Sequence, residues 1–374
     1  MMETPYLLVF KDDVTELDRI LLGCALFLAA CGVLCVFSAG AGRMGRGWDF
    51  ALRQSLWLAA GGLAMFFMVG VGYRRLLDAA YPIYGLTLFL LFLTVLLAPR
   101  IKGAQSWLSL GFFRFQPSEF AKVALVMWAA GFVALRKRTH NDLGAFLGGL
   151  GVAIPAVVLV LAQPDTGSAL VYLVITFGML FIAGTPLRYL GTLMGLGVVS
   201  APFLWFCLKE YQKLRLLVFL DPMRDPLGAG YNVIQSRIAV GSGGFWGKGF
   251  MMGMQSKLRF LPEPHTDFIF SVYSEEFGFL GTSLLLVLFG LLFSRIAAAG
   301  LRSRDRRCKI MAAGIAVWIW FQMFESIGMS IGLMPVTGLP LPFLSYGGSA
   351  LLSVFVALGL VGSVYIDSAK RFHF

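Results

Sequence analysis

Charged residues are scarce in this sequence. They make up 14% of its 374 residues, whereas 58% of the residues are hydrophobic. A soluble fold of this size is improbable, and the apolar runs repeatedly approach the length that crosses about 30 Å of hydrocarbon. These runs lack the period-2 alternation of barrel strands, so helices must satisfy the backbone groups in lipid. The sequence therefore predicts an all-α, polytopic membrane protein.

Paired or clustered cysteines are also missing. Cys24, Cys31 and Cys35 lie in the first apolar run, and Cys207 and Cys308 are far apart in the chain. These spacings match neither a disulfide framework nor a metal-binding motif. We expect all five to be small residues in the core or facing lipid, and we predict no metal-ligand cluster.

The sequence has no separate basic domain that could bind nucleic acid. Its formal net charge is +11, but the cationic residues are spread over the loops between apolar runs. Membrane topology and contacts with anionic lipids account for this charge better than a nucleic-acid partner does. Low-complexity tracts and internal repeats are not found either. We predict a single integral membrane domain over residues 1–374.

The apolar runs predict about ten transmembrane helices. The predicted spans are Ile20–Ser38, Leu52–Val71, Leu76–Ala98, Ser118–Leu135, Leu143–Ala162, Ser168–Ala183, Leu187–Leu208, Phe277–Ala298, Ile310–Leu333 and Tyr346–Ile366. With the N-terminus inside, arginines cluster in the short inner connections, as the positive-inside rule requires, and both termini are cytoplasmic. The rule is not obeyed cleanly, because Arg43, Arg53 and Arg100 would lie outside. They could contact lipid phosphates or an anionic substrate.

The long polar stretch between spans seven and eight, residues 209–276, is predicted to be a large extracytoplasmic loop. It contains an amphipathic run, a turn at DPMRDPLGAG, a polar helical run, the glycine cluster GSGGFWGKG and the segment LPEPHTDF. The glycine cluster is not a phosphate-binding loop, because Ser242 replaces the first glycine of that pattern and Gly249 follows Lys248. It is better explained as a turn that allows close backbone approach.

Ionisable residues inside a membrane or at its edge are costly and are therefore functional candidates. Glu119 and Lys122 are three residues apart, so they could pair on one helix face, either at a substrate site or as a structural ion pair. Asp165 could contribute to a site or cap span six. Glu325 is expected to be tied to a neighbouring helix.

Asp267 is the lone carboxylate of the HTDF segment, where the chain enters span eight. It could be a catalytic base, or it could cap the first helical turn while Glu275 and Glu276 are solvated. His265 fits a hydrogen-bonded loop residue as well as a base. No Asp-x-Asp pair for a diphosphate-bound divalent ion occurs in an outer loop. The segment Met334–Gly348, rich in glycine and proline, is expected to form a wall of a lipid or substrate cleft.

Five motifs occur in order along the chain: FRFQPSEFAK, AQPDTGSALV, DPLGAGYNVIQSRIAVGSGGFWGKG, LPEPHTDFIF and PFLSYGGSAL. Together they resemble the SEDS family (shape, elongation, division and sporulation) of bacterial cell-wall proteins, over nearly the whole chain. The stretch from the glycine cluster to HTDF is more similar to the rod-shape branch than to the division branch. The resemblance implies ten transmembrane helices and a peptidoglycan glycosyltransferase. Such an enzyme polymerises lipid II at the outer face of the bacterial cytoplasmic membrane, together with a class B penicillin-binding protein.

The resemblance further implies that Asp267 is the family's essential acidic residue and that Glu119, Lys122 and Asp165 match other sensitive positions. Converting the α-linked diphosphate of lipid II into a β-1,4 glycan takes one inverting displacement, which needs one base and a stabilised leaving group. We expect Asp267 to be the base. The candidate diphosphate partners are Arg114, Lys122, Arg237, Lys248 and Arg259.

Three further points stay open in the sequence. No cofactor is certain, but a divalent cation, Mg²⁺ or Mn²⁺, could share the leaving-group role. A lipid II flippase is the alternative function, because buried charges and broken helices also suit alternating access. A non-catalytic scaffold of the cell-wall complex is a third.

Overall fold

The computed structural model describes residues 17–41, 45–99, 105–109, 111, 114–135, 143–208, 210–258 and 260–370. Its helices are α2 (Arg19–Ala41), α3 (Gly47–Val71), α4 (Tyr73–Asp78), α5 (Ala80–Leu97), α6 (Pro117–Leu135), α7 (Leu143–Ala162), α8 (Thr166–Ile182), α9 (Leu187–Cys207), α10 (Glu210–Leu220), η1 (Pro222–Arg224), α11 (Ala229–Ser242), α12 (Met254–Lys257), α13 (Ile269–Arg302), α14 (Arg306–Ile331) and α15 (Gly348–Lys370). The strands β1 (Leu108–Ser109) and β2 (Arg114–Phe115) form a short antiparallel pair. The predicted all-α class is confirmed.

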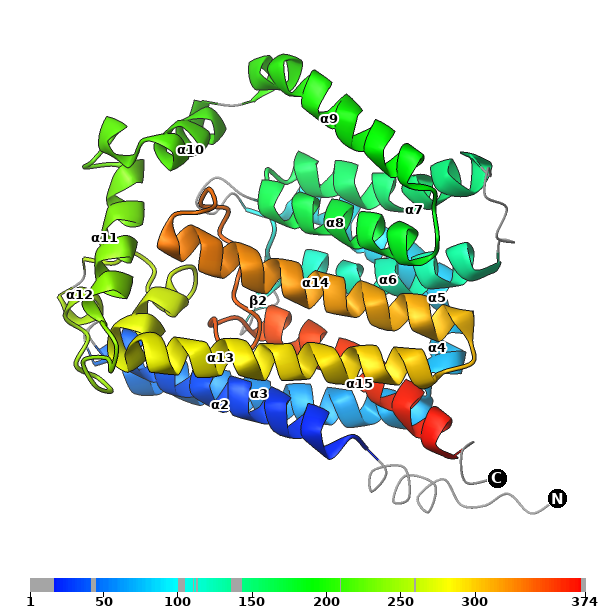
Figure 1. Cartoon of the computed structure of the whole chain (residues 1–374), viewed down its shortest axis with the longest axis horizontal. Coiled ribbons are helices and arrows are strands. Elements are labelled where there is room, and N and C mark those ends of the chain that lie inside the picture. Colours follow the sequence, from blue (N-terminus) through cyan, green and yellow to red (C-terminus); the bar gives the residue numbers. More distant parts are fainter. Residues whose placement is uncertain are drawn as a thin grey trace.

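The long helices form one bundle, drawn lengthwise in Figure 1. There α13 and α14 run along the middle, with α2 and α3 on one side and α7 and α8 on the other, and α15 packs against α3 and α13. The loop helices α10, α11 and α12 gather at one end of the bundle. Helix α2 begins, and α15 ends, at the opposite end. This arrangement agrees with a topology in which the large loop lies on one side and the start of α2 and the end of α15 lie on the other.

Seven helices of the described ranges are long and apolar enough to cross a membrane: α2, α3, α5, α6, α13, α14 and α15. The apolar parts of α7 and α8 are shorter, at Phe146–Ala162 and Thr166–Ile182. Nine of the ten predicted spans each fall on one helix, with α9 as the seventh, whereas the third, Leu76–Ala98, begins on α4 and continues on α5. The chain is a multi-pass helical membrane protein.

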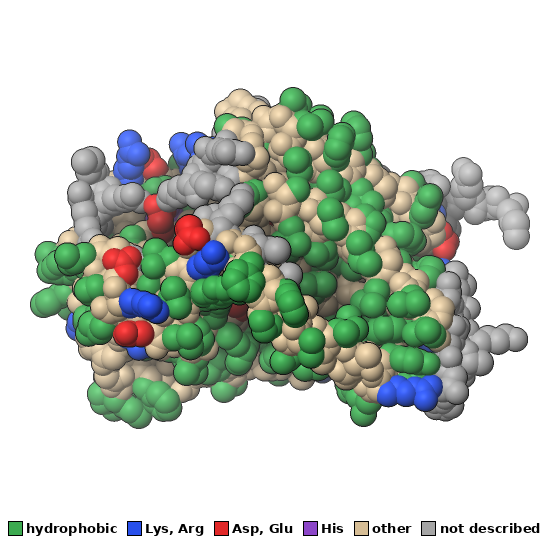
Figure 2. All heavy atoms as spheres, turned by 90° about the horizontal axis from the view of Figure 1, so that it is seen from above, with side chains coloured by type: hydrophobic (Ala, Val, Ile, Leu, Met, Phe, Trp, Pro, Cys, Tyr) green, Lys and Arg blue, Asp and Glu red, His purple; other side chains and the backbone are tan. Residues whose placement is uncertain are grey.

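The surface of the bundle is apolar where lipid would cover it. Leu63 and Phe67 on α3 and Phe89 on α5 are largely exposed. Apolar side chains spread over most of the face shown in Figure 2, while charged side chains gather mainly toward the end that carries α10 and α11. Such a surface is expected for a protein whose solvent is hydrocarbon around the middle and water at the ends.

Helices α6 and α15 lie inside the bundle, and they are the most buried of the seven spans. The described cysteines agree with the prediction for them: Cys24, Cys35 and Cys308 are buried, Cys31 is half-buried, and all four are free. The hydrophobic core reaches from the start of α2 to α15. The single-domain assignment stays a prediction.

Span eight was predicted to begin at Phe277, but α13 begins at Ile269. The helix is broken at Gly278, whose φ of 62° and ψ of −160° are not helical. The apolar pattern marks only the part after this break, which explains the error. The glycine cluster docks at the break, where the amide of Gly249 donates to the carbonyl of Glu276 (3.0 Å) and the amide of Phe279 donates to the carbonyl of Gly244 (2.9 Å). Backbone groups freed by the break are thus paired again.

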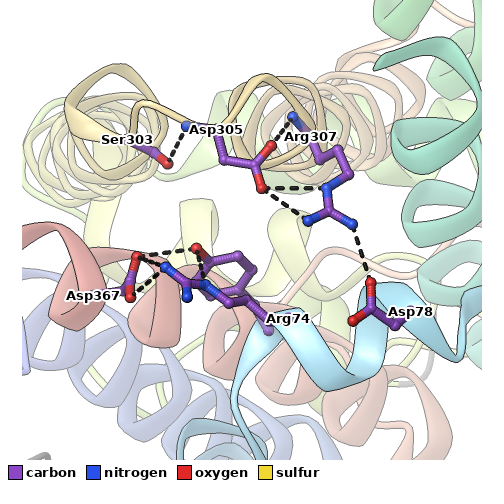
Figure 3. A network of polar contacts seen from close by, with 7 residues as sticks. Arg74, Asp78, Ser303, Asp305, Arg307 and Asp367 are labelled. Atoms are coloured by element: carbon purple, nitrogen blue, oxygen red, sulfur yellow. Dashed lines mark hydrogen bonds and ion pairs between the residues drawn. The ribbon is translucent and has the colours of Figure 1, made fainter. Parts of the chain in front are cut away.

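The end of the bundle opposite the large loop is held by ion pairs (Figure 3). Arg74 on α4 pairs with Asp367 on α15 at 3.0 Å, and the Tyr73 hydroxyl donates to the same carboxylate. Burial raises the pKa of Tyr73, so its phenol keeps the proton that it donates. Arg307 on α14 contacts Asp78 at 3.1 Å. Arginines that were expected to mark the inner side therefore also join helices there.

Candidate active site

Asp267 lies in a turn between α12 and α13 and is half-buried. Helix α13 begins two residues later, with Phe268 at the N-cap position and no capping hydrogen bond from that side chain. Asp267 therefore lies one residue before the N-cap position, and the capping alternative stays a prediction. Its carboxylate belongs to the turn that leads into the helix.

The Asp267 turn is fastened to the segment between α14 and α15. The Ser345 hydroxyl donates to the carbonyl of Thr266 at 2.8 Å, and the amide of Tyr346 donates to the carbonyl of His265 at 2.9 Å. The side-chain amide of Gln54 on α3 donates to the carbonyl of Ser345 at 3.2 Å. These bonds fix the backbone immediately before Asp267 against two elements that are distant in sequence.

His265 is packed at the junction where the Asp267 turn meets α3 and the segment between α14 and α15. Its ring stacks on Phe50 with a centroid distance of 4.7 Å and lies 5.8 Å from the ring of Tyr346. Its side chain is buried, and its Nε2 lies 4.0 Å from a carboxylate oxygen of Glu263. These contacts favour the loop-residue interpretation, and a role as base stays a prediction.

A second carboxyl group, that of Glu325, is bonded to the segment that borders Asp267. Glu325 on α14 accepts a hydrogen bond from the hydroxyl of Thr337. The next residue, Gly338, has a φ of +78°, and a Cβ there would lie 3.6 Å from Oδ2 of Asp267. Glu325 was expected to be tied to a neighbouring helix. It is instead tied to the segment that follows its own helix, because the chain folds back over the end of α14.

Glu119 and Lys122 form a buried ion pair. Lys122 Nζ and Glu119 Oε1 are 2.8 Å apart, and both side chains are almost completely enclosed. The ammonium group lies 5.3 Å from the ring centroid of Trp318 on α14, and Ser353 on α15 donates to the other Glu119 oxygen at 3.3 Å. The structural ion-pair interpretation is confirmed, since this pair joins α6 to two neighbours. A contact of either residue with substrate stays a prediction.

Asp165 caps α8, as its structural alternative proposed. Its Oδ1 accepts from the amide of Ser168 at 3.0 Å, and its Oδ2 accepts from the Ser168 hydroxyl at 2.8 Å. Two residues later, a Cβ on Gly167 would lie 3.2 Å from the carbonyl oxygen of Thr337. The first turn of α8 therefore borders the segment that faces Asp267.

The capping alternative for Asp267 had Glu275 and Glu276 solvated, but both are buried. Lys248 donates to Glu275 at 2.7 Å, and the amide of Met254 donates to the same oxygen at 2.8 Å. Glu276 accepts from the Ser38 hydroxyl on α2. Glu275 is enclosed by Lys248 of the glycine cluster and by α12, and Glu276 lies against α2. Lys248 is thus occupied by an internal ion pair.

The remaining cationic candidates are at different distances from the Asp267 turn. Arg237 on α11 donates to the carbonyl of Gly332 at 2.8 Å, directly before the segment that faces Asp267. Arg114 lies exposed on β2. Arg259 lies outside the described residues. Among the cationic candidates in the described ranges, Arg237 therefore contacts the residue at the start of this segment.

Sequence reasoning missed several residues of the junction. Thr337, Gly338 and Ser345 were treated only as parts of a glycine and proline segment, and Gln54 was not singled out. Gln54 carried a usable signal, because it is a side-chain amide within an apolar run and such groups need internal partners in lipid. The positive φ of Gly338 could not be read from the sequence.

Comparison with known proteins places the chain in a family. The family model described as "Cell cycle protein", which covers the FtsW, RodA and SpoVE proteins, matches residues 18–370. The chain belongs to this family. The match begins one residue before α2 and runs to the end of α15. The Asp267 turn and the contacts given for it therefore lie within the match.

Family relatives match over almost their whole length. "Peptidoglycan glycosyltransferase MrdB" of Escherichia coli K12 is 37% identical, with 98% of this chain and 97% of that protein covered. "Peptidoglycan glycosyltransferase RodA" of Treponema pallidum is 33% identical, with coverages of 94% and 98%. "Probable peptidoglycan glycosyltransferase FtsW" of a Geobacter species is 39% identical, with coverages of 93% and 96%.

Solved structures share the fold. A chain from the study "Structural coordination of polymerization and crosslinking by a peptidoglycan synthase complex" matches with a TM-score of 0.81 and 34% identity, covering 95% of this chain and 99% of that one. The crystal structure of Thermus thermophilus rod-shape determining protein RodA matches with a TM-score of 0.71 and 32% identity, with coverages of 94% and 97%. The family assignment therefore holds in sequence and in structure.

Proposed function

We propose that this chain is a peptidoglycan glycosyltransferase that polymerises lipid II into β-1,4 glycan strands for cell elongation and shape. The names of its full-length relatives support the activity. One structural observation supports the site: the half-buried carboxylate of Asp267 is held in a turn bonded to the segment between α14 and α15. Several family motifs meet at this junction.

In the proposed reaction, Asp267 is the general base. Its carboxylate takes the proton of the acceptor 4-hydroxyl while that oxygen bonds to C1 of the donor sugar. The bond from C1 to the diphosphate oxygen breaks, and the lipid diphosphate leaves with the electron pair. Attack from the opposite face converts the α-linkage into a β-linkage, so no covalent enzyme intermediate is needed. The contacts of Ser345 and Tyr346 with the preceding residues support this role by restricting the movement of the carboxylate.

The leaving diphosphate needs positive charge close to the base. Among the candidates, Arg237 is favoured, because it borders the segment that faces Asp267 and a guanidinium can contact phosphate in a bidentate manner. Arg114 is a second candidate on the exposed hairpin. Lys122 and Lys248 are less suited, since each is already paired with a carboxylate in the interior.

Cofactor, partner and location complete the proposal. A Mg²⁺ or Mn²⁺ ion could assist the diphosphate, but within the described ranges no group of three or more His, Cys, Asp or Glu residues could hold it. The proposed partner is a class B penicillin-binding protein, because a structural relative comes from a study of polymerisation and crosslinking by a complex. We place the protein in the bacterial cytoplasmic membrane, with the Asp267 turn on the outer side.

The decisive experiment replaces Asp267 with Asn, which keeps the size of the side chain and removes the base. The purified variant should keep its thermal unfolding midpoint but lose lipid II polymerisation in detergent, with Glu210→Gln as the matched control in the same loop. In the described part of the chain Glu210 forms an ion pair with Lys213 on α10, and the Glu210 side chain is 90% exposed. Undiminished glycan synthesis by Asp267→Asn would overturn the assignment of the base.

The same assay separates the alternatives. A flippase has no defined transport in detergent, so polymerisation by the purified chain argues against that function as the principal one. A non-catalytic scaffold would leave polymerisation by the whole complex intact when Asp267 is replaced. Loss of glycan synthesis in the complex therefore distinguishes an enzyme from a scaffold.

A further inference from the structure

Glu325 is a buried carboxyl group to which the mechanism above gives no role. It lies on α14 and keeps 2% of its surface exposed. Its Oε1 accepts the hydrogen bond from Thr337, whereas its Oε2 is buried and has no hydrogen-bond partner in the described part of the chain. An ionised carboxylate normally has both oxygens solvated or bonded, so this environment is costly for a charge.

Positive charge does not compensate Glu325. Within the described ranges no lysine or arginine forms an ion pair with it: Lys122 pairs with Glu119, and Arg237 donates to the carbonyl of Gly332. Asp267, which borders the Thr337–Gly338 segment that Glu325 holds, is also acidic. A second negative charge in the neighbourhood of Asp267 would be unfavourable, which favours a neutral Glu325.

The difference in burial decides which carboxyl holds the proton. Asp267 is half-buried, and Glu325 is enclosed with an oxygen that lacks a partner. Burying an unpaired charge costs far more than burying a neutral carboxylic acid. The proton therefore belongs on Glu325, and the charge belongs on Asp267.

Two consecutive residues link these carboxyl groups mechanically. Thr337 donates to Glu325, and Gly338 lies against Oδ2 of Asp267, where an added Cβ would come within 3.6 Å. A hydrogen bond at Thr337 therefore fixes the backbone that borders Asp267. Loss of the Glu325 oxygen would release this backbone, since the segment has glycine at the next position.

We propose that Glu325 is a protonated carboxylic acid that positions Asp267 through Thr337 and Gly338. This inference rests on the proposed function, in which Asp267 is the base. Glu325 keeps its own proton throughout, because the proton of the acceptor hydroxyl goes to Asp267. A neutral Glu325 adds no negative charge beside the diphosphate of the donor, which a second carboxylate would repel.

Infrared spectroscopy of the full-length protein in detergent at neutral pH tests the protonation. The spectrum of the wild type minus that of Glu325→Gln should contain the C=O stretching band of a protonated carboxylic acid. The matched control, Glu210→Gln, should give a difference spectrum without this band, because Glu210 is exposed on α10. A Glu325 difference spectrum that holds only carboxylate bands overturns the proposal.

Lipid II polymerisation tests the positioning role. Glu325→Leu removes the acceptor for Thr337 and should lower kcat about tenfold, the equivalent of one hydrogen bond lost from the catalytic arrangement. Glu325→Gln restores an acceptor of the same shape and should recover most of this loss. Thr337→Val should reproduce the defect of Glu325→Leu, and Thr337→Ser should rescue it.

The possible outcomes separate the two proposals. If Glu325→Gln is as inactive as Asp267→Asn, an ionised Glu325 is required and the inference is wrong. If Asp267→Asn remains active while the infrared band of Glu325 is present, the assignment of Asp267 as base fails instead. If Glu325→Leu does not fold, the infrared band and the pair of Thr337 variants still decide the question.

Discussion

The hydroxyl of Ser345 donates a hydrogen bond to the carbonyl oxygen of Thr266, 2.8 Å away, although the two residues are 79 positions apart. The same Ser345 oxygen accepts a bond from the amide of Leu341, also at 2.8 Å. One side chain therefore closes a turn in its own segment and fastens that segment to the residue before Asp267. This junction suggests where small changes should affect activity.

Replacing Ser345 with Ala should loosen the Asp267 turn. The change leaves the carbonyl of Thr266 and the amide of Leu341 without their partner, and each buried unsatisfied group costs about 1–3 kcal/mol. We expect a lower thermal unfolding midpoint and a fall in lipid II polymerisation. Ser294→Ala is the matched control, because that exposed hydroxyl bonds only to its own helix. Equal behaviour of the two variants would show that the junction does not depend on Ser345.

The buried pair of Glu119 and Lys122 should behave differently from an exposed pair. Replacing Lys122 with Met leaves an uncompensated carboxylate and should lower the free energy of unfolding by about 3–5 kcal/mol. The double variant Glu119→Gln and Lys122→Met should recover part of that loss. Glu210 and Lys213, on the surface of α10, form a matched exposed pair that should contribute at most about 1 kcal/mol. A thermodynamic cycle without coupling between Glu119 and Lys122 would contradict the prediction.

The glycine cluster should tolerate alanine at one position and not at another. A Cβ on Gly247, whose φ is +81°, would lie 2.1 Å from the carbonyl oxygen of Glu276. Gly247→Ala should therefore cost more than about 2 kcal/mol and disturb the break in α13. Nothing lies within 4 Å of a Cβ on Gly241, so Gly241→Ala should stay within about 0.5 kcal/mol of wild type. Thermal unfolding of both variants checks the difference.

The capping role of Asp165 predicts a clear order of stabilities. Asn is as good an N-cap as Asp, whereas Ala loses about 1 kcal/mol. We expect Asp165→Asn to match the wild type in thermal unfolding and Asp165→Ala to melt earlier. A polymerisation defect in Asp165→Asn at unchanged stability would assign the carboxylate a role with the substrate in addition to the cap.

Local patterns predicted the helices well because membrane insertion depends on hydrophobicity summed over a window of about 20 residues. All ten predicted spans fall on helices for this reason. The start of α13 was missed because its first part is polar on one side, and the break at Gly278 depends on backbone groups supplied by the distant glycine cluster. Glu275 and Glu276 are buried rather than solvated because Lys248, α12 and α2 contact this part of α13.

The sequence alone determined the membrane class and the helices, and its motifs indicated the family and the importance of Asp267. Only the tertiary structure decided that Ser345 fastens the Asp267 turn, that Lys122 and Lys248 are occupied by internal carboxylates, and that Glu325 faces Asp267 across Thr337 and Gly338. The physical reason is that a helix forms from interactions between near neighbours in the chain. A site forms where segments far apart in the chain satisfy each other's polar groups in a medium without water to do so.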